Sequence, residues 1–211
     1  EDNPTPTIGD KVNVFITGSN HWAAFNQWPP EGVEEFRLFL SENNNLRNDK
    51  STQSGVYDQY TSDPSHPVPY RPDISWNRNR EYMIEDQRFA SQRPDVLTYQ
   101  TDVLTKDVTM LGPVLADLFV KLTTTDADFV VKVIDVFPDD FNEYTSRDVP
   151  MGGYQMLVRG EIFRGRYRKS FSHPEGFKPG KIEQVNFSLP DIAHTFKKGH
   201  RIMVQIQSSW F

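Results

Sequence analysis

The sequence predicts an all-β fold, a β-sandwich, and three observations lead to this prediction. Short runs rich in Val, Leu, Phe, Tyr and Thr recur through residues 93–140, as they do in strands. Gly, Pro, Thr and Asp separate these runs at short intervals, where turns are expected. The same stretch carries no recognisable catalytic motif, so we expect a scaffold there rather than an active site.

Size and composition fit one domain. The chain has 211 residues, 36% of them hydrophobic, which is enough for a single all-β domain with its own core. The 15 Phe, 8 Tyr and 4 Trp residues suit a sandwich core and also leave rings for a ligand-binding face. Composition does not distinguish these two uses.

The charge pattern disfavours several classes of partner. The formal net charge is −6 and the basic residues form no stripe, so neither a nucleic acid nor an acidic substrate is indicated. No apolar run approaches about 18 residues and no apolar leader is visible, so we expect no membrane insertion. The absence of Cys excludes disulfides, thiolate metal ligands and a Cys nucleophile, but leaves the compartment open.

The first elements follow from alternation. Residues 1–10 are polar and read as a linker or boundary segment, so we expect the folded domain to occupy residues 11–211. A strand is predicted over residues 11–18, where apolar and polar positions alternate. A second strand is predicted over residues 35–40 with one buried face. The apolar alternating positions of these two strands are Val12, Val14, Ile16, Phe36, Leu38 and Leu40.

A long irregular segment then covers residues 41–80. It is rich in Asn, Asp, Ser and Pro, and proline interrupts any regular ladder. A loop of this length is uncommon in a compact domain unless it has a function. We therefore expect functional residues here before anywhere else.

The second half supplies the remaining strands. Three are predicted over residues 96–101, 114–122 and 129–137, and a fourth around Gly160 and Gly165, where glycine indicates bulges or bends. Residues 182–189 and 201–207 alternate as strands, and residues 191–198 are expected to form a short helix or turn between them. About eight strands result, the usual number for a jelly roll.

The histidines invite a catalytic interpretation. His66, His173, His194 and His200 lack any Ser and acid arrangement in the sequence, and a general base needs a nucleophile within hydrogen-bond reach. We expect structural or surface roles, with His200 fixing a turn. A self-contained metal hydrolase would rest only on such scattered His and Asp residues.

Two charged groups have alternative interpretations. Five aspartates could hold calcium, but their spacing matches no EF-hand loop, so solvated turns are preferred. They are Asp126, Asp128, Asp135, Asp139 and Asp140. Five basic residues could face RNA on one side of a strand, but ion pairs within the protein or with a neighbouring domain are preferred. They are Arg159, Arg164, Arg166, Arg168 and Lys169.

Four stretches together suggest a family. They are VFITGSNHWAAFNQWPP, YTSDPSHPVPYRP, EDQRFASQRPDVLTYQTDVLTKDV with ADLFVKLTTTDADFVVKVIDVFPD, and GYQMLVRGEIFRGRYRKSF with HTFKKGHRIMVQIQSSWF. In combination, from Lys11 onward, they resemble the C-terminal domain of the X-Pro dipeptidyl-peptidase and cocaine esterase (CocE/NonD) class of serine hydrolases. The nearest resemblance is to α-amino acid ester hydrolases, also described as glutaryl-7-aminocephalosporanic acid acylase-like.

The resemblance implies a jelly-roll sandwich of galactose-binding-like form, with α/β-hydrolase and cap domains upstream. In α/β-hydrolases the nucleophile lies on a G-x-S-x-G elbow, which this chain lacks, so the domain alone is expected to be inactive. The implied partners are its own upstream hydrolase domain, a small acyl ester or amide substrate of the full enzyme, and a possible second copy of the full-length protein. No cofactor or metal is implied, and a periplasmic or secreted location is expected.

The resemblance also directs attention to two aromatic groups. Tyr70, Arg71, Trp76 and Tyr82 are predicted to wall the acyl pocket of the full enzyme, with Trp76 as the principal residue. The alternative is that Trp76 only seals a domain interface.

Trp22, Phe25 and Trp28 form the second aromatic group. We predict that they dock the sandwich on its neighbouring domain. The alternative is a carbohydrate-binding module in which exposed tryptophan rings form a platform for a glycan. Exposed, coplanar rings would favour that alternative.

Overall fold

The computed structural model describes residues 12–50, 55–73, 80–143 and 148–211. Within these ranges the regular structure consists of ten strands, one short α-helix and three 3₁₀ turns, which confirms the predicted all-β sandwich. The helical elements are η1 (Glu42–Asn44), η2 (Glu81–Ile84), α1 (Arg88–Ser91) and η3 (Gly165–Tyr167).

The larger layer is a six-stranded sheet with the order β3-β4-β5-β10-β7-β8. All its neighbouring strands are antiparallel except β4 and β5, which are parallel. The strands are β3 (Phe39–Ser41), β4 (Asn45–Arg47), β5 (Leu97–Gln100), β7 (Asp128–Val136), β8 (Gln155–Arg164) and β10 (Arg201–Gln207).

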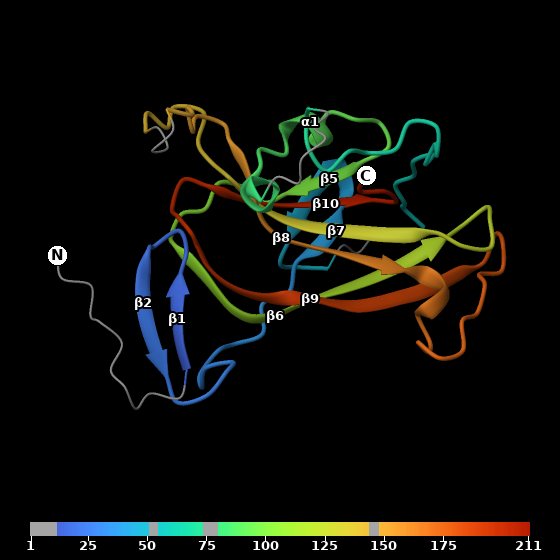
Figure 1. The fold of residues 1–211 in the computed structure, drawn as a ribbon, viewed down its shortest axis with the longest axis horizontal. Coiled ribbons are helices and arrows are strands. Elements are labelled where there is room, and N and C mark those ends of the chain that lie inside the picture. The colour runs from blue at the N-terminus through green and yellow to red at the C-terminus, as the bar shows by residue number, and fades with distance from the viewer. Residues whose placement is uncertain (1–11, 51–54, 74–79, 144–147) are drawn as a thin grey trace.

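The second layer is a pair of long antiparallel strands, β6 (Val108–Lys121) and β9 (Ile182–Phe196). In Figure 1 this pair lies below the larger sheet, and α1 with its flanking loops lies on the sheet's opposite side. The pairing shifts register between Gly112 and Val114. Gly112 has a φ of +111°, a conformation that favours glycine, so the bulge falls where the sequence permits it.

A separate hairpin joins one end of the second layer. It consists of β1 (Val12–Ile16) and β2 (His21–Phe25), which pair antiparallel. Figure 1 shows it beside β6 and β9. An isolated bridge links Thr17 to His194 of β9 and attaches the hairpin to the sandwich.

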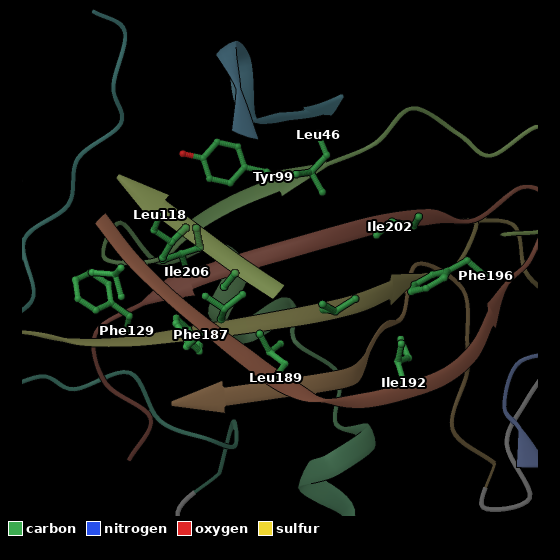
Figure 2. Close-up of a cluster of buried hydrophobic side chains, with 14 of the residues drawn as sticks. Leu46, Tyr99, Leu118, Phe129, Phe187, Leu189, Ile192, Phe196, Ile202 and Ile206 are labelled. Carbon is green, nitrogen blue, oxygen red and sulfur yellow. The ribbon is translucent and has the colours of Figure 1, made fainter. Parts of the chain in front are cut away.

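The core lies between the two layers. On β7 the alternate residues Phe129, Val131 and Val133 face inward, as strand geometry requires, and β9 contributes Phe187 and Leu189 from the other side. Figure 2 shows Phe129, Phe187 and Leu189 gathered with Leu118 of β6 and Ile206 of β10. Their burial from water is the main stabilising contribution to the sandwich.

Three sequence predictions about strand boundaries are wrong. Residues 191–198 do not form a helix or turn, because β9 continues to Phe196. The alternate positions Ile192, His194 and Phe196 are all buried there, and the polar His194 hid that alternation. The predicted strand 35–40 begins only at Phe39.

The wrong boundaries at residues 35–40 and in the basic run have local causes. Phe36 and Leu40 remain exposed, so the apolar alternation of residues 35–40 does not bury a face against the core, and only Leu38 packs there. The predicted strand through the basic run ends at Arg164, because η3 follows. At Gly165 a Cβ atom would lie 2.6 Å from the Phe177 ring and 2.8 Å from the Phe129 ring, so only glycine fits.

Candidate functional site

The outer face of the six-stranded sheet, away from β6 and β9, is covered by residues 80–92, which we call the cover. The cover pairs with the edge strand β8. Gln87 N donates to Gln155 O over 2.8 Å, and Leu157 N donates to Glu85 O over 3.3 Å. Backbone hydrogen bonds therefore hold the cover in place, although it contains only short helical turns.

The cover brings together two of the predicted pocket-wall residues. Tyr70 and Tyr82 make an edge-to-face contact with ring centroids 5.7 Å apart, and Tyr82 makes a similar contact with Trp210 at 6.1 Å. Tyr70 N donates to Phe211 O over 2.8 Å, which ties this loop to the last residues of the chain. Trp76, the principal predicted residue, lies outside the described residues.

Arg71, another predicted pocket-wall residue, forms ion pairs with two acidic residues. Its side chain is largely buried and lies 2.8 Å from an oxygen of Asp73 and 3.9 Å from an oxygen of Glu85. Burial raises the pKa of Glu85, and the nearby guanidinium opposes that shift. Arg71 therefore joins the proline-rich loop to the cover, and its buried Nε has no hydrogen-bond partner.

The cover also presents apolar surface. Met83 and Ile84, next to Tyr82, are both more exposed than buried, at 53% and 58%. The hydroxyl of Tyr154, the residue before β8, donates to Ile84 O over 3.1 Å and supports this turn. A fixed backbone with outward apolar side chains can contact a ligand or a neighbouring domain.

The three predicted interface residues differ in exposure. Trp22 is 42% exposed and packs edge-to-face against Phe15, which is 39% exposed, with centroids 5.6 Å apart. Phe25 and Trp28 contact each other at 6.1 Å, and the Trp28 indole N–H donates to Asp191 of β9. Trp28 therefore anchors the hairpin to the sandwich, whereas Trp22 and Phe15 face outward.

The ring geometry bears on the glycan alternative. The Phe15 and Trp22 planes are inclined by 66°, and the Phe25 and Trp28 planes by 54°. Neither pair is coplanar, so neither makes the flat platform that the carbohydrate-binding alternative requires. No observation on these four residues favours it.

A buried charged network lies at the end of the core. Asp135 of β7 binds His194 Nε2 at 3.1 Å and His200 Nδ1 at 2.8 Å through its two oxygens. Burial disfavours ionisation, but the hydrogen bonds from both imidazoles outweigh it and lower the pKa of Asp135. The prediction that these histidines are structural agrees with this geometry.

The same network superficially resembles a catalytic triad. Thr17 Oγ1 lies 2.8 Å from His194 Nδ1, so a hydroxyl, an imidazole and a carboxylate are in series. In hydrolase triads Nε2 faces the nucleophile and Nδ1 faces the acid, which is the reverse order. The Thr17 hydroxyl also donates to Ala193 O, and the His194 ring is completely buried. A ring without access to substrate cannot serve as a general base, so the network is a structural joint.

The basic run forms ion pairs within the protein, which is the interpretation we preferred over an RNA-binding face. Arg164 binds Asp128 at 3.0 Å, Arg166 binds Asp126, and the buried Arg168 binds Glu183 at 2.6 Å. These pairs occupy two of the aspartates considered as calcium ligands. Within the part of the chain that the structure describes, no cluster of three or more His, Cys, Asp or Glu residues could hold a metal.

Two residues were missed. Trp210 follows the last strand and completes the aromatic cluster, but nothing in the sequence distinguishes it from an exposed terminal residue. Lys132 is completely buried on the outer face of β7. The sequence signal for the burial of Lys132 is the run Asp128–Val136, which is apolar on both faces. Strands that are buried on both faces have such continuous apolar runs.

Comparison with known proteins identifies the family. Residues 7–211 match the family described as the X-Pro dipeptidyl-peptidase C-terminal non-catalytic domain. The chain belongs to this family. The same residues carry the sandwich and the structural joint described above, so the family assignment covers the whole described fold.

The relatives are hydrolases. The chain is 32% identical to cocaine esterase from Rhodococcus sp. (strain MB1 Bresler), over 95% of this chain and 34% of the relative. It superposes on an aminopeptidase from the marine sediment archaeon Thaumarchaeota archaeon with a TM-score of 0.87 and 38% identity, covering 96% of this chain and 33% of that one. An α-amino acid ester hydrolase matches with a TM-score of 0.85 and 36% identity, covering 94% and 33%.

The chain therefore spans about a third of the length of these relatives. This confirms the resemblance stated from sequence, a C-terminal domain of the CocE/NonD class. Among the described residues no helix is long and apolar enough to cross a membrane.

Proposed function

We propose that this non-catalytic C-terminal domain packs on the α/β-hydrolase domain of a serine hydrolase and helps to shape its acyl pocket. The enzyme would cleave esters or amides of short, α-amino acyl groups, the chemistry suggested by the printed names of the α-amino acid ester hydrolase and the aminopeptidase. In such an enzyme Ser forms the acyl-enzyme with His as base and an acid as its orienter, all outside this chain. The sandwich supplies surface and support.

The observation that carries the docking part is the exposed pair Phe15 and Trp22. Large aromatic side chains favour burial, and aromatic residues are enriched at protein interfaces. The hairpin that holds them is bound to β9 by Thr17 N donating to Ala193 O over 3.1 Å and Thr195 N donating to Thr17 O over 2.8 Å. A surface fixed in this way is already organised for docking and loses little conformational entropy on binding.

The cover supports the pocket part of the proposal. Tyr70 and Tyr82 are held by each other and by Trp210, while Met83 and Ile84 project outward. Apolar and aromatic walls are typical of pockets for small acyl groups. Trp76, which lies between Tyr70 and Tyr82 in sequence, remains a candidate for the same wall.

The docking part can be tested by mixing the chain with the separately produced catalytic part of its parent enzyme. We expect binding that Trp22→Ala weakens at least about tenfold, because truncating a buried aromatic hot spot typically costs about 2 kcal/mol or more and about 1.4 kcal/mol is tenfold. The matched control is Phe171→Ala, which removes a ring that is 81% exposed on a different loop and should leave binding unchanged. Equal effects of the two variants would reject the hairpin as the docking surface.

The pocket part has a separate test in the full-length enzyme. Tyr82→Ala should raise KM for amino-acid esters with bulky acyl groups more than for a small acyl group, whereas Trp22→Ala should not discriminate between them. A uniform loss of activity across all acyl groups would contradict the pocket role of the cover.

A further inference from the structure

Lys132 occupies an unusual environment. Its side chain is completely buried between the six-stranded sheet and the cover, and none of the ion pairs among the described residues includes it. Its Nζ donates to Gln87 Oε1 over 2.9 Å and lies 5.3 Å from the centroid of the Trp210 ring. Burial lowers the pKa of Lys132 to about 7. The Phe89 ring centroid lies 6.0 Å from Nζ. A single amide oxygen and two aromatic rings solvate only part of a buried ammonium, which has three N–H donors.

The strand register places further polar groups beside it. Lys132 of β7 pairs with Gln205 of β10, and Gln205 pairs with Thr98 of β5. Side chains of directly paired residues lie on one face with Cβ atoms about 5 Å apart. The three residues therefore form a continuous polar row across three strands, beneath the cover.

The orientation of the two glutamine amides is fixed. Gln87 Nε2 donates to Glu85 O over 3.0 Å, and Gln205 Nε2 donates to Gln87 O over 3.3 Å. Because each amide nitrogen has a carbonyl acceptor, each Oε1 is left as an acceptor. Lys132 uses the Oε1 of Gln87, but the buried Oε1 of Gln205 has no partner, and neither does the buried Oγ1 of Thr98.

The row thus contains unused N–H donors on Lys132 and unused acceptor oxygens on Gln205 and Thr98, but no direct hydrogen bond joins them. An ammonium has three N–H donors, and one described hydrogen bond uses one of them. The unused oxygens of Gln205 and Thr98 are in the same row. Buried polar groups in native proteins are almost always satisfied, by ordered water where no protein group reaches them.

We propose that the row formed by Lys132, Gln205 and Thr98 is an internal binding site for ordered water, which bridges the Lys132 ammonium to the oxygens of Gln205 and Thr98. Water fits because it both donates and accepts. A metal cation would be repelled by the ammonium charge. An anion could pair with the ammonium, but it has no hydrogen to donate to the unpartnered Oε1 of Gln205. Water in this site would hydrate the space between the sheet and the cover, and the Lys132 end of the row lies 5.3 Å from the centroid of the Trp210 ring.

The first test measures long-lived internal water by oxygen-17 relaxation dispersion on the wild-type chain and on Lys132→Met, in which the side chain keeps its approximate length. The variant should lose at least one long-lived water. Lys106→Met, which changes an exposed lysine, is the matched control and should lose none. An unchanged dispersion in folded Lys132→Met would overturn the proposal.

The second test does not depend on that variant folding. Gln205→Glu places a carboxylate in the row, and an opposite charge at this range should raise the pKa of Lys132 by about 1 or more, measured by carbon and nitrogen NMR of the side chain. Gln207→Glu, on the same strand and face but one row further along, should produce a smaller change. Equal changes in the two variants, or none in Gln205→Glu, would show that the Gln205 oxygen is not part of the environment of Lys132.

Discussion

Replacing Lys132 by Met should make the stability of this domain less dependent on pH. The substitution removes a buried charge that has no acidic partner among the described residues and keeps a side chain of similar length. Hydrophobic replacement of buried charged groups is often neutral or stabilising, because the cost of removing the charge from water disappears. The variant therefore separates the cost of burying the ammonium from the packing of its aliphatic part.

The magnitude follows from the two pKa values. Burial lowers the pKa of Lys132 from 10.5 to about 7, so the unfolded chain binds more protons than the folded chain between these values. Stability therefore rises with pH across that window, and the full penalty is present below pH about 7. The difference of about 3.5 corresponds to about 5 kcal/mol at 1.36 kcal/mol per pH unit.

The variant also has a cost that does not depend on pH. Gln87 Oε1 loses its donor, which costs about 1–3 kcal/mol. Lys132→Met should therefore be about 2–4 kcal/mol more stable than the wild type at pH 6 and about 1–3 kcal/mol less stable at pH 10.5.

Urea unfolding followed by circular dichroism, at intervals from pH 6 to 10.5, measures this difference. Other titrating groups, including Tyr154, whose pKa burial raises to about 12, cancel between the two proteins. Lys106→Met should follow the wild type at every pH. A stability difference between Lys132→Met and the wild type that stays constant from pH 6 to 10.5 would refute the reasoning.

Three further substitutions test other parts of the structure. Asp135→Asn should cost about 3–5 kcal/mol, because it leaves two buried imidazoles without their carboxylate. Because folding lowers the pKa of Asp135, its carboxylate stabilises the fold above the unfolded pKa of 3.8, and this stabilisation is lost as pH falls through the folded pKa. The free energy of unfolding of the variant should therefore depend less on pH in acid. An unchanged pH dependence would count against the network. Gly165→Ala should lower Tm by several degrees, because its Cβ would overlap the rings of Phe177 and Phe129, and an unchanged Tm would contradict the packing described. Arg168→Lys should cost about 1–3 kcal/mol in urea unfolding, since lysine cannot stack on Phe177 while donating to Glu183 and three backbone carbonyls; full stability would show that the planar guanidinium is not required.

Alternation predicted the strands that have one apolar face in the core. The run around Phe187 and the last strand were predicted correctly, because their inward residues are apolar and their outward ones mostly polar. The run around Phe129 was predicted from its continuous Val, Ile and Phe content, because both of its faces are buried. The pairing of the basic run with nearby acids was also foreseen. The sequence was sufficient to predict these ion pairs, since each joins residues of neighbouring strands or turns.

The rest depended on groups that meet only in the folded chain. His194 continues the buried face of β9, but a polar residue in that position indicates the end of a strand rather than its continuation. Its partners Thr17 and Asp135 are separated from it by 177 and 59 residues in sequence. The apolar run around Lys132 indicates that both faces of its strand are buried, but no pattern in the sequence shows that residues 80–92 cover the outer face.

The central claim is that the chemistry of this hydrolase class lies outside this chain. The most direct measurement treats the purified chain of 211 residues with a serine-directed phosphonate and determines its mass, alongside a turnover assay with a chromogenic amino-acid ester. We expect no covalent adduct and no turnover above buffer. Stoichiometric labelling, at Thr17 or at any serine, accompanied by turnover that the phosphonate abolishes, would contradict it.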